Sequence, residues 1–135
     1  MELTQDRLAR FALVVAAGVL LLVGLRGLVM PRTFLAPVGL RPVGAPAMSE
    51  MRASVGGKDV GMAIFFLCAA ATPHLRVAGL VAVVAYMGGV TVGRLVSAVV
   101  DGVPNVLVAS FFLAEVSAAT LALAALAVPA TRRSP

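Results

Sequence analysis

Residues 11–25 read FALVVAAGVLLLVGL and carry no charge. The apolar segment around this stretch runs from about Leu8 to Met30, with Arg26 near its end. At about 1.5 Å per residue, a helix of this length crosses the roughly 30 Å hydrocarbon core of a bilayer. We predict a transmembrane helix over residues 8–30. A cleaved signal peptide is disfavoured, because the apolar run is too long and no small-residue cleavage site follows Met30.

Three more apolar segments follow and predict spans over residues 49–71, 75–100 and 104–128. Ser49 is the expected N-cap of the second span, and Pro129 is expected to end the fourth. The sequence therefore predicts an all-α fold: one integral membrane four-helix bundle over residues 1–135, with both termini on the same side.

The connection between the first two spans is long and rich in proline. Residues 31–48 contain four prolines and two glycines, a composition that disfavours a regular helix. Apolar side chains such as Phe34, Leu35 and Val38 lie among them. We expect a loop that lies on the membrane interface or folds over the end of the bundle.

Composition supports membrane insertion and excludes other classes. Apolar residues make up 61% of the chain and charged residues 13%, whereas soluble domains carry roughly 25% charged residues. The net charge of +5 comes without a dense basic patch, and aromatic residues are only 5%, so a nucleic-acid partner is not expected. Membrane lipids are the expected surroundings.

The distribution of arginines predicts the orientation. The side of the termini would hold five arginines and the opposite loops two, and positive charge concentrates on the cytoplasmic side. We expect a multi-pass protein of the plasma (inner) membrane with cytoplasmic termini. The five arginines are Arg7, Arg10, Arg76, Arg132 and Arg133, and the two are Arg32 and Arg41.

Most of the remaining charges fall in the half of the bundle far from the termini, and every span contributes. A charge in the hydrocarbon costs roughly 2.5–3.5 kcal/mol or more, so such residues face the interior, a cavity or a partner. In the first span, Arg26 lies near the end that belongs to this half. The candidate ligand-binding or ion-pair residues are Arg94, Glu115, Asp59, Arg52, Asp101, Glu50 and Lys58.

Depth and spacing suggest specific pairs. Arg94 and Glu115 lie at compatible depths on the third and fourth spans and are the first choice for a buried pair. Arg52 and Asp59 are seven residues apart, which places them on one face of an α-helix. Ion pairs that lock the helices in register are the alternative reading, favoured for Arg26, Glu50 and Asp101; for Glu115, Arg94 and Asp59 the two readings weigh equally.

Small residues predict packing faces. Gly89-x-x-x-Gly93, continued by Ser97, forms a stripe on the third span, and Gly56-Gly57 with Gly61 does so on the second. The sequence has no metal-ligand cluster, nucleophile triad or dinucleotide fingerprint. No metal and no cofactor are expected.

Two motifs resemble a known family. Glu50-x-Arg52-x-x-x-Gly56-Gly57 opens one span, and Gly93-Arg94-x-x-Ser97-x-x-x-Asp101-Gly102-x-Pro104 ends the next. Together they resemble domain of unknown function family 4345, small bacterial four-helix membrane proteins loosely similar to DoxX-like proteins. The resemblance covers about residues 8–128 and implies the four-helix architecture. It implies no activity and transfers no catalytic residue.

Three functions stay open. The first is binding of a small amphiphilic or lipid-like ligand, lipophilic or anionic, or of a membrane partner or second copy, through the charged half. The second is an intramembrane enzyme, an isomerase or oxidoreductase partner, with Glu115 or Asp59 as general acid/base and Arg94 holding an anionic group. The third is an oligomeric proton or ion pathway through Glu115.

Overall fold

The computed structural model describes residues 2–128, with side chains from Gln5 onward, and every regular element in this part is helical. Pro129, Arg132 and Arg133, used above to predict the end of the fourth span and the orientation, lie outside the described residues. The long helices are α1 (Glu2–Val29), α4 (Lys58–Ala71) with the helical turns before it, α5 (Arg76–Val100) and α6 (Val106–Ala127).

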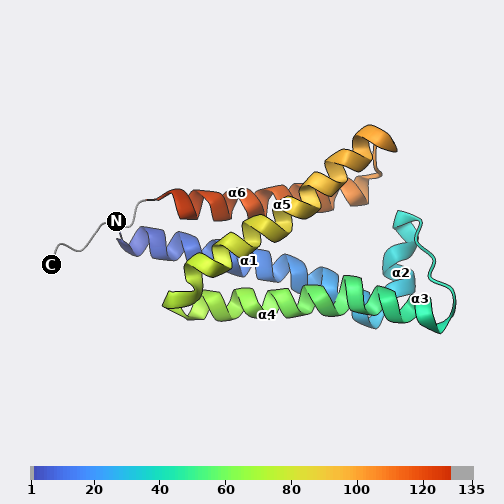
Figure 1. Cartoon of the computed structure of the whole chain (residues 1–135), viewed down its shortest axis with the longest axis horizontal. Coiled ribbons are helices and arrows are strands. Elements are labelled where there is room, and N and C mark those ends of the chain that lie inside the picture. Colours follow the sequence, from blue (N-terminus) through green and yellow to red (C-terminus); the bar gives the residue numbers. More distant parts are fainter. Residues whose placement is uncertain (1, 129–135) are drawn as a thin grey trace.

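Four helical segments are long and apolar enough to cross a membrane. The shortest, α6, has 22 residues, or about 33 Å. The start of α1 and the end of α6 lie at the same end of the bundle (Figure 1), where the Gln5 amide donates to the Val128 carbonyl at 2.7 Å. The predicted all-α four-helix fold with its termini on one side is confirmed. We call the end of the bundle where α1 starts and α6 ends the terminal end, and the opposite end the loop end.

Small side chains form many of the contacts between helices, beside a few large buried ones such as Phe66 and Leu13. The buried stripe of α1 is mostly alanine, and α6 buries three alanines on one face. Larger apolar residues such as Leu22 and Leu113 point outward. This arrangement suits a lipid environment, where close backbone packing holds helices together and large apolar side chains need no burial. The buried alanines are Ala9, Ala12, Ala16 and Ala17 of α1 and Ala118, Ala122 and Ala125 of α6.

Two glycines permit the closest approaches. A Cβ on Gly79 of α5 would lie 2.5 Å from the Ala69 Cβ of α4, and one on Gly56 would lie 2.7 Å from the Leu28 side chain of α1. The predicted packing stripe on α5 makes no contact with another described helix: a Cβ on Gly89 or Gly93 would meet nothing within 4 Å. That face of α5 points away from the other described helices.

Helix α5 diverges from α4 toward the loop end (Figure 1). The two helices meet near the turn Pro73–Leu75, where Gly79 contacts Ala69. Beyond this point α4 stays packed on α1, and α5 stays packed on α6. The bundle is therefore tight at the terminal end and more open between α4 and α5 at the loop end.

The proline-rich connection folds over the loop end instead of forming an irregular loop. It contains α2 (Pro31–Leu35), a 3-10 turn (Ala36–Val38), and the start of the next helix. Pro31 occupies the first helical turn, where the missing N–H costs no hydrogen bond. We call residues 31–40 the cover segment. The Asn105 amide donates to the Pro37 carbonyl at 2.8 Å, which fastens this segment to the start of α6.

The second span begins earlier than predicted. Its first helix, α3, covers Gly44–Met51 with Val43 as N-cap, so the expected N-cap Ser49 lies inside it. Pro46 is tolerated because it lies in the first turn. A π-helical turn, Arg52–Gly57, then joins α3 to α4. Asn105, and not Pro104, precedes α6, and its side-chain oxygen accepts from the Val108 N–H at 3.0 Å.

Candidate functional site

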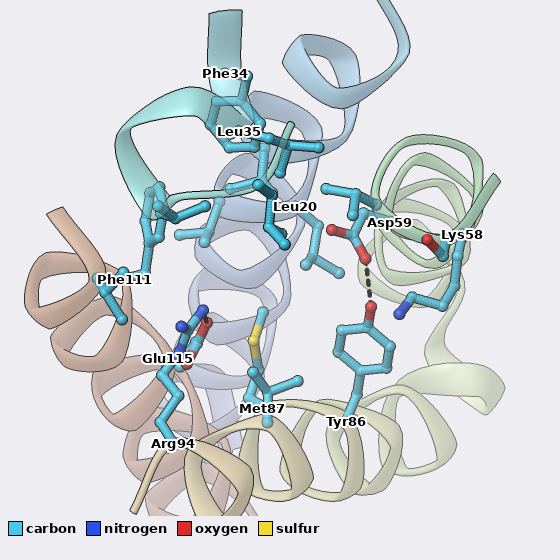
Figure 2. Close-up of a pocket in the computed structure, with 18 residues that line it drawn as sticks. Leu20, Phe34, Leu35, Lys58, Asp59, Tyr86, Met87, Arg94, Phe111 and Glu115 are labelled. Carbon is cyan, nitrogen blue, oxygen red and sulfur yellow. Dashed lines mark hydrogen bonds and ion pairs between the residues drawn. The ribbon is translucent and has the colours of Figure 1, made fainter. Parts of the chain in front are cut away.

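A cavity of about 510 Å³ lies in the loop-end half, where α5 has left α4. All four long helices line it, and the cover segment closes one side (Figure 2). From the cover segment come Phe34, Leu35, Val38 and Leu40. The helices contribute polar residues, described below, and the apolar residues Val19, Leu20, Val23, Val55, Met87, Val90, Val108 and Phe111.

On one wall, Arg94 of α5 holds Glu115 of α6. The Arg94 Nε donates to Glu115 Oε2 at 2.7 Å and Nη2 donates to Oε1 at 2.8 Å, a bidentate geometry. The Arg94 side chain is 27% exposed and that of Glu115 is 11% exposed. The guanidinium also lies 5.9 Å from the centre of the Phe111 ring. The pair predicted from depth therefore forms at the cavity wall.

On the opposite side, Tyr86 of α5 donates its hydroxyl hydrogen bond to Asp59 of α4 (Figure 2). The Lys58 ammonium lies 5.5 Å from the centre of the Tyr86 ring, a cation–π contact. Asp59 is buried, whereas Lys58 is exposed. We call Arg94–Glu115 and Tyr86–Asp59 the two polar couples.

An apolar strip separates the two polar couples. Met87 lies between them in Figure 2 and is 1% exposed, and Leu20 of α1 is 5% exposed. Tyr86, Val90 and Arg94 are spaced four residues apart along α5, so they share a broad face of this helix toward the cavity. One helix thus contributes a partner to each couple.

Tyr86 is the site residue that sequence reasoning missed. It is the single tyrosine of the chain, which contains no tryptophan, and it stands in an otherwise apolar span. Its hydroxyl, eight residues before Arg94 in an apolar span, is the feature of the sequence that marks it as a candidate site residue. Charge alone does not single it out, because tyrosine is neutral.

The predicted stacking of Arg52 with Asp59 is wrong. Arg52 is exposed and its Nε donates to the Leu28 carbonyl at 3.1 Å. The seven-residue spacing places two residues on one face only in a continuous α-helix. Here the π-helical turn Arg52–Gly57 lies between them and breaks the register.

Two other candidates do not reach the cavity. Asp101 accepts a hydrogen bond from the Ser97 hydroxyl at 2.8 Å and is exposed at the end of α5. Glu50 is exposed on α3, and its side chain does not line the cavity. Of the seven predicted residues, the structure gathers Arg94, Glu115, Asp59 and Lys58 around one space.

A separate ion pair lies at the terminal end. Arg76, counted in the sequence as a loop charge, is buried and pairs with Asp6 of α1, which also accepts from Arg10 at 3.1 Å. Among residues 5–128, no three histidine, cysteine or acidic side chains gather to hold a metal ion. The polar side chains that line the central cavity are therefore the two polar couples, Lys58 and Ser54.

Comparison with known proteins places most of the chain in one family. Residues 8–126 match the family described as domain of unknown function, DUF4345. The chain belongs to this family. The match covers most of α1 and α6, all of α4 and α5, and both polar couples, so the cavity lies within the family domain. No curated protein and no solved structure matches the chain.

Proposed function

We propose that this DUF4345 protein binds a small amphiphilic molecule in the cavity between α1, α4, α5 and α6. The observation that carries the proposal is the pair of polar couples on facing walls of an apolar space of about 510 Å³. Such a volume falls within the range of roughly 300–1,000 Å³ that is common for small-molecule sites.

The charges in the cavity favour a ligand that is neutral overall. Arg94 is neutralised by Glu115, and the negative charge of Asp59 is balanced by the adjacent Lys58. A strongly charged ligand would have to break one of these arrangements. A lipophilic molecule with hydrogen-bonding groups can instead bond to a couple and place its apolar part against Met87 and Val90.

We also propose an orientation, in which the terminal end faces the cytoplasm and the protein lies in the plasma membrane. The arginine count of the sequence supports it, with five on the side of the termini (Arg7, Arg10, Arg76, Arg132 and Arg133) against two in the opposite connection. The cavity would then open in the outer half of the bilayer, and ligands would enter from that leaflet.

Intrinsic fluorescence tests the binding. Tyr86 is the only tyrosine and there is no tryptophan, so fluorescence reports on the cavity wall alone. A bromine-substituted long-chain alcohol should quench it saturably, and the unsubstituted alcohol should reverse the quenching. Val90→Phe, which fills the cavity, should weaken binding at least ten-fold. Val92→Phe changes a side chain of α5 that is 59% exposed and should leave binding unchanged. Linear, non-competable quenching would contradict the proposal.

A second candidate function, proton transfer on a lipophilic substrate, is favoured by one contact. The Tyr86 hydroxyl bonded to the Asp59 carboxylate offers an acid and a base at the same wall. A long-chain ketone incubated in heavy water would exchange its α-hydrogens faster with the native protein than with Tyr86→Phe. Equal exchange rates would remove this candidate and leave binding.

A further inference from the structure

A second cavity, of about 530 Å³, lies at the loop end, outside the central one. The end of α1, the start of α2 and the start of α3 surround it. Its charged lining residues are Arg32 and Arg52, with no acidic side chain among them. Glu50 is only two residues from Arg52 in the chain, yet it does not line this cavity. The cavity is therefore electropositive, unlike the balanced central one.

Several hydrogen-bond donors face this space. The Arg52 guanidinium is anchored through its Nε to the Leu28 carbonyl, which leaves four N–H donors. Thr33 adds a hydroxyl. Gly44 and Ala45 also line the cavity, and they lie in the first turn of α3, where backbone N–H groups have no intrahelical partner. An anion with several oxygens can accept from all of these groups.

The depth of the cavity favours a phospholipid over a free anion. It lies where the first span ends and the second begins, which is the level of the lipid headgroups. Leading away from it along α1, Val29, Leu25 and Leu22 are 70%, 50% and 57% exposed. Their spacing of four and three residues places them on one face, so they form an apolar path from the cavity into the hydrocarbon.

We propose that this cavity binds the phosphate headgroup of an anionic phospholipid whose acyl chains lie along Leu22, Leu25 and Val29. Arg32 and Arg52 bind the phosphate oxygens, since the planar guanidinium matches phosphate geometry. The absence of an acidic lining residue selects a headgroup with net negative charge over a zwitterionic one. This site is independent of the proposed central ligand, because neither arginine lines the central cavity.

Native mass spectrometry of the full chain in detergent tests the proposal. Phosphatidylglycerol is titrated against phosphatidylcholine with identical acyl chains. We expect the native protein to bind the first lipid at least ten-fold more tightly. Arg32→Gln combined with Arg52→Gln should abolish this preference. The control, Arg26→Gln with Arg41→Gln, removes two exposed arginines of the same half that line neither cavity and should change affinity less than three-fold.

Three results would overturn the proposal: equal binding of the two lipids, an equal loss in the control variant, or displacement of phosphatidylglycerol by an equal concentration of inorganic phosphate. Helical circular dichroism and the Tyr86 quenching assay verify that the double variant keeps its fold and its central cavity. Should it fail to fold, Arg32→Gln alone is used. The Arg32 side chain makes no hydrogen bond or ion pair within residues 5–128, and its loss should weaken binding at least three-fold.

Discussion

At the scale of single residues, the Arg94–Glu115 couple shows how two costly charges coexist in a membrane helix bundle. Two parallel hydrogen bonds join them, and the Phe111 ring lies beside the guanidinium. Removing one partner leaves the other charge without compensation, which is worse than removing both. The couple should therefore behave as a unit.

Glu115→Gln and Arg94→Gln are each expected to lower the free energy of unfolding by about 3 kcal/mol, the lower end of the range for buried pairs because Arg94 is partly exposed. The double variant should lose clearly less than the sum of the two. Unfolding titrations in mixed detergent micelles measure all three. Strict additivity would show that the two side chains are not coupled.

Tyr86→Phe removes the hydroxyl that donates to Asp59 and leaves this carboxylate without that partner. We expect a loss of about 1.5–3 kcal/mol, typical of a hydrogen bond to a charged group. In an Asp59→Leu background the same change should cost under about 0.5 kcal/mol. The same unfolding titration measures the cost of Tyr86→Phe in both backgrounds. An equal cost in the two would contradict the contact between Tyr86 and Asp59.

The Arg94–Glu115 pair can be predicted from the sequence because charge and depth are both readable from the chain. The position of Arg52 cannot, since the predicted pairing requires a continuous helical register that the π-helical turn interrupts. The role of Tyr86 cannot either, because the partner of Asp59 is set by how α5 crosses α4. Such a crossing depends on tertiary packing and leaves no local signal.

At the scale of helices, α5 contains two kinds of glycine that look alike in the sequence. Gly79 touches Ala69 and Leu13, whereas Gly89 faces open space. The sequence motif at Gly89 and Gly93 is the more typical helix-packing pattern, yet the glycine of α5 that closely contacts another described helix is Gly79. A pattern shows that packing can occur and does not show which neighbour is present.

Gly79→Ala should destabilise the bundle by about 1–3 kcal/mol, because the new Cβ would collide with Ala69 and the helices must separate. Gly89→Ala should be neutral or stabilise by up to roughly 1 kcal/mol, since alanine favours the helix. Unfolding of the two variants under identical conditions compares them. Comparable destabilisation by both would mean that Gly89 packs against something outside this chain.

At the scale of the whole molecule, the bundle is asymmetric along its length. The terminal end is closed by Asp6–Arg76 and by the contact at Gly79, while the loop end contains both cavities and the cover segment. The four spans and the common side of the termini could be predicted from hydropathy. The cavities could not, since they arise from the divergence of α5 from α4.

The proposed orientation predicts which turns are accessible from outside the cell. In a Cys68→Ser background, Val103→Cys in the turn after α5 should react with a membrane-impermeant thiol reagent in intact cells. His74→Cys, in the turn at the terminal end, should react only after permeabilisation. Both positions are exposed. The reverse pattern of labelling would place the termini outside.

The most direct test of the central claim is an experimental structure of the chain in lipid nanodiscs, with the density between the two polar couples inspected. We predict an elongated density against Met87 that reaches Tyr86–Asp59 or Arg94–Glu115 with its polar end. A bundle in which α5 packs against α4 along its whole length, with no space beside Met87, would contradict it.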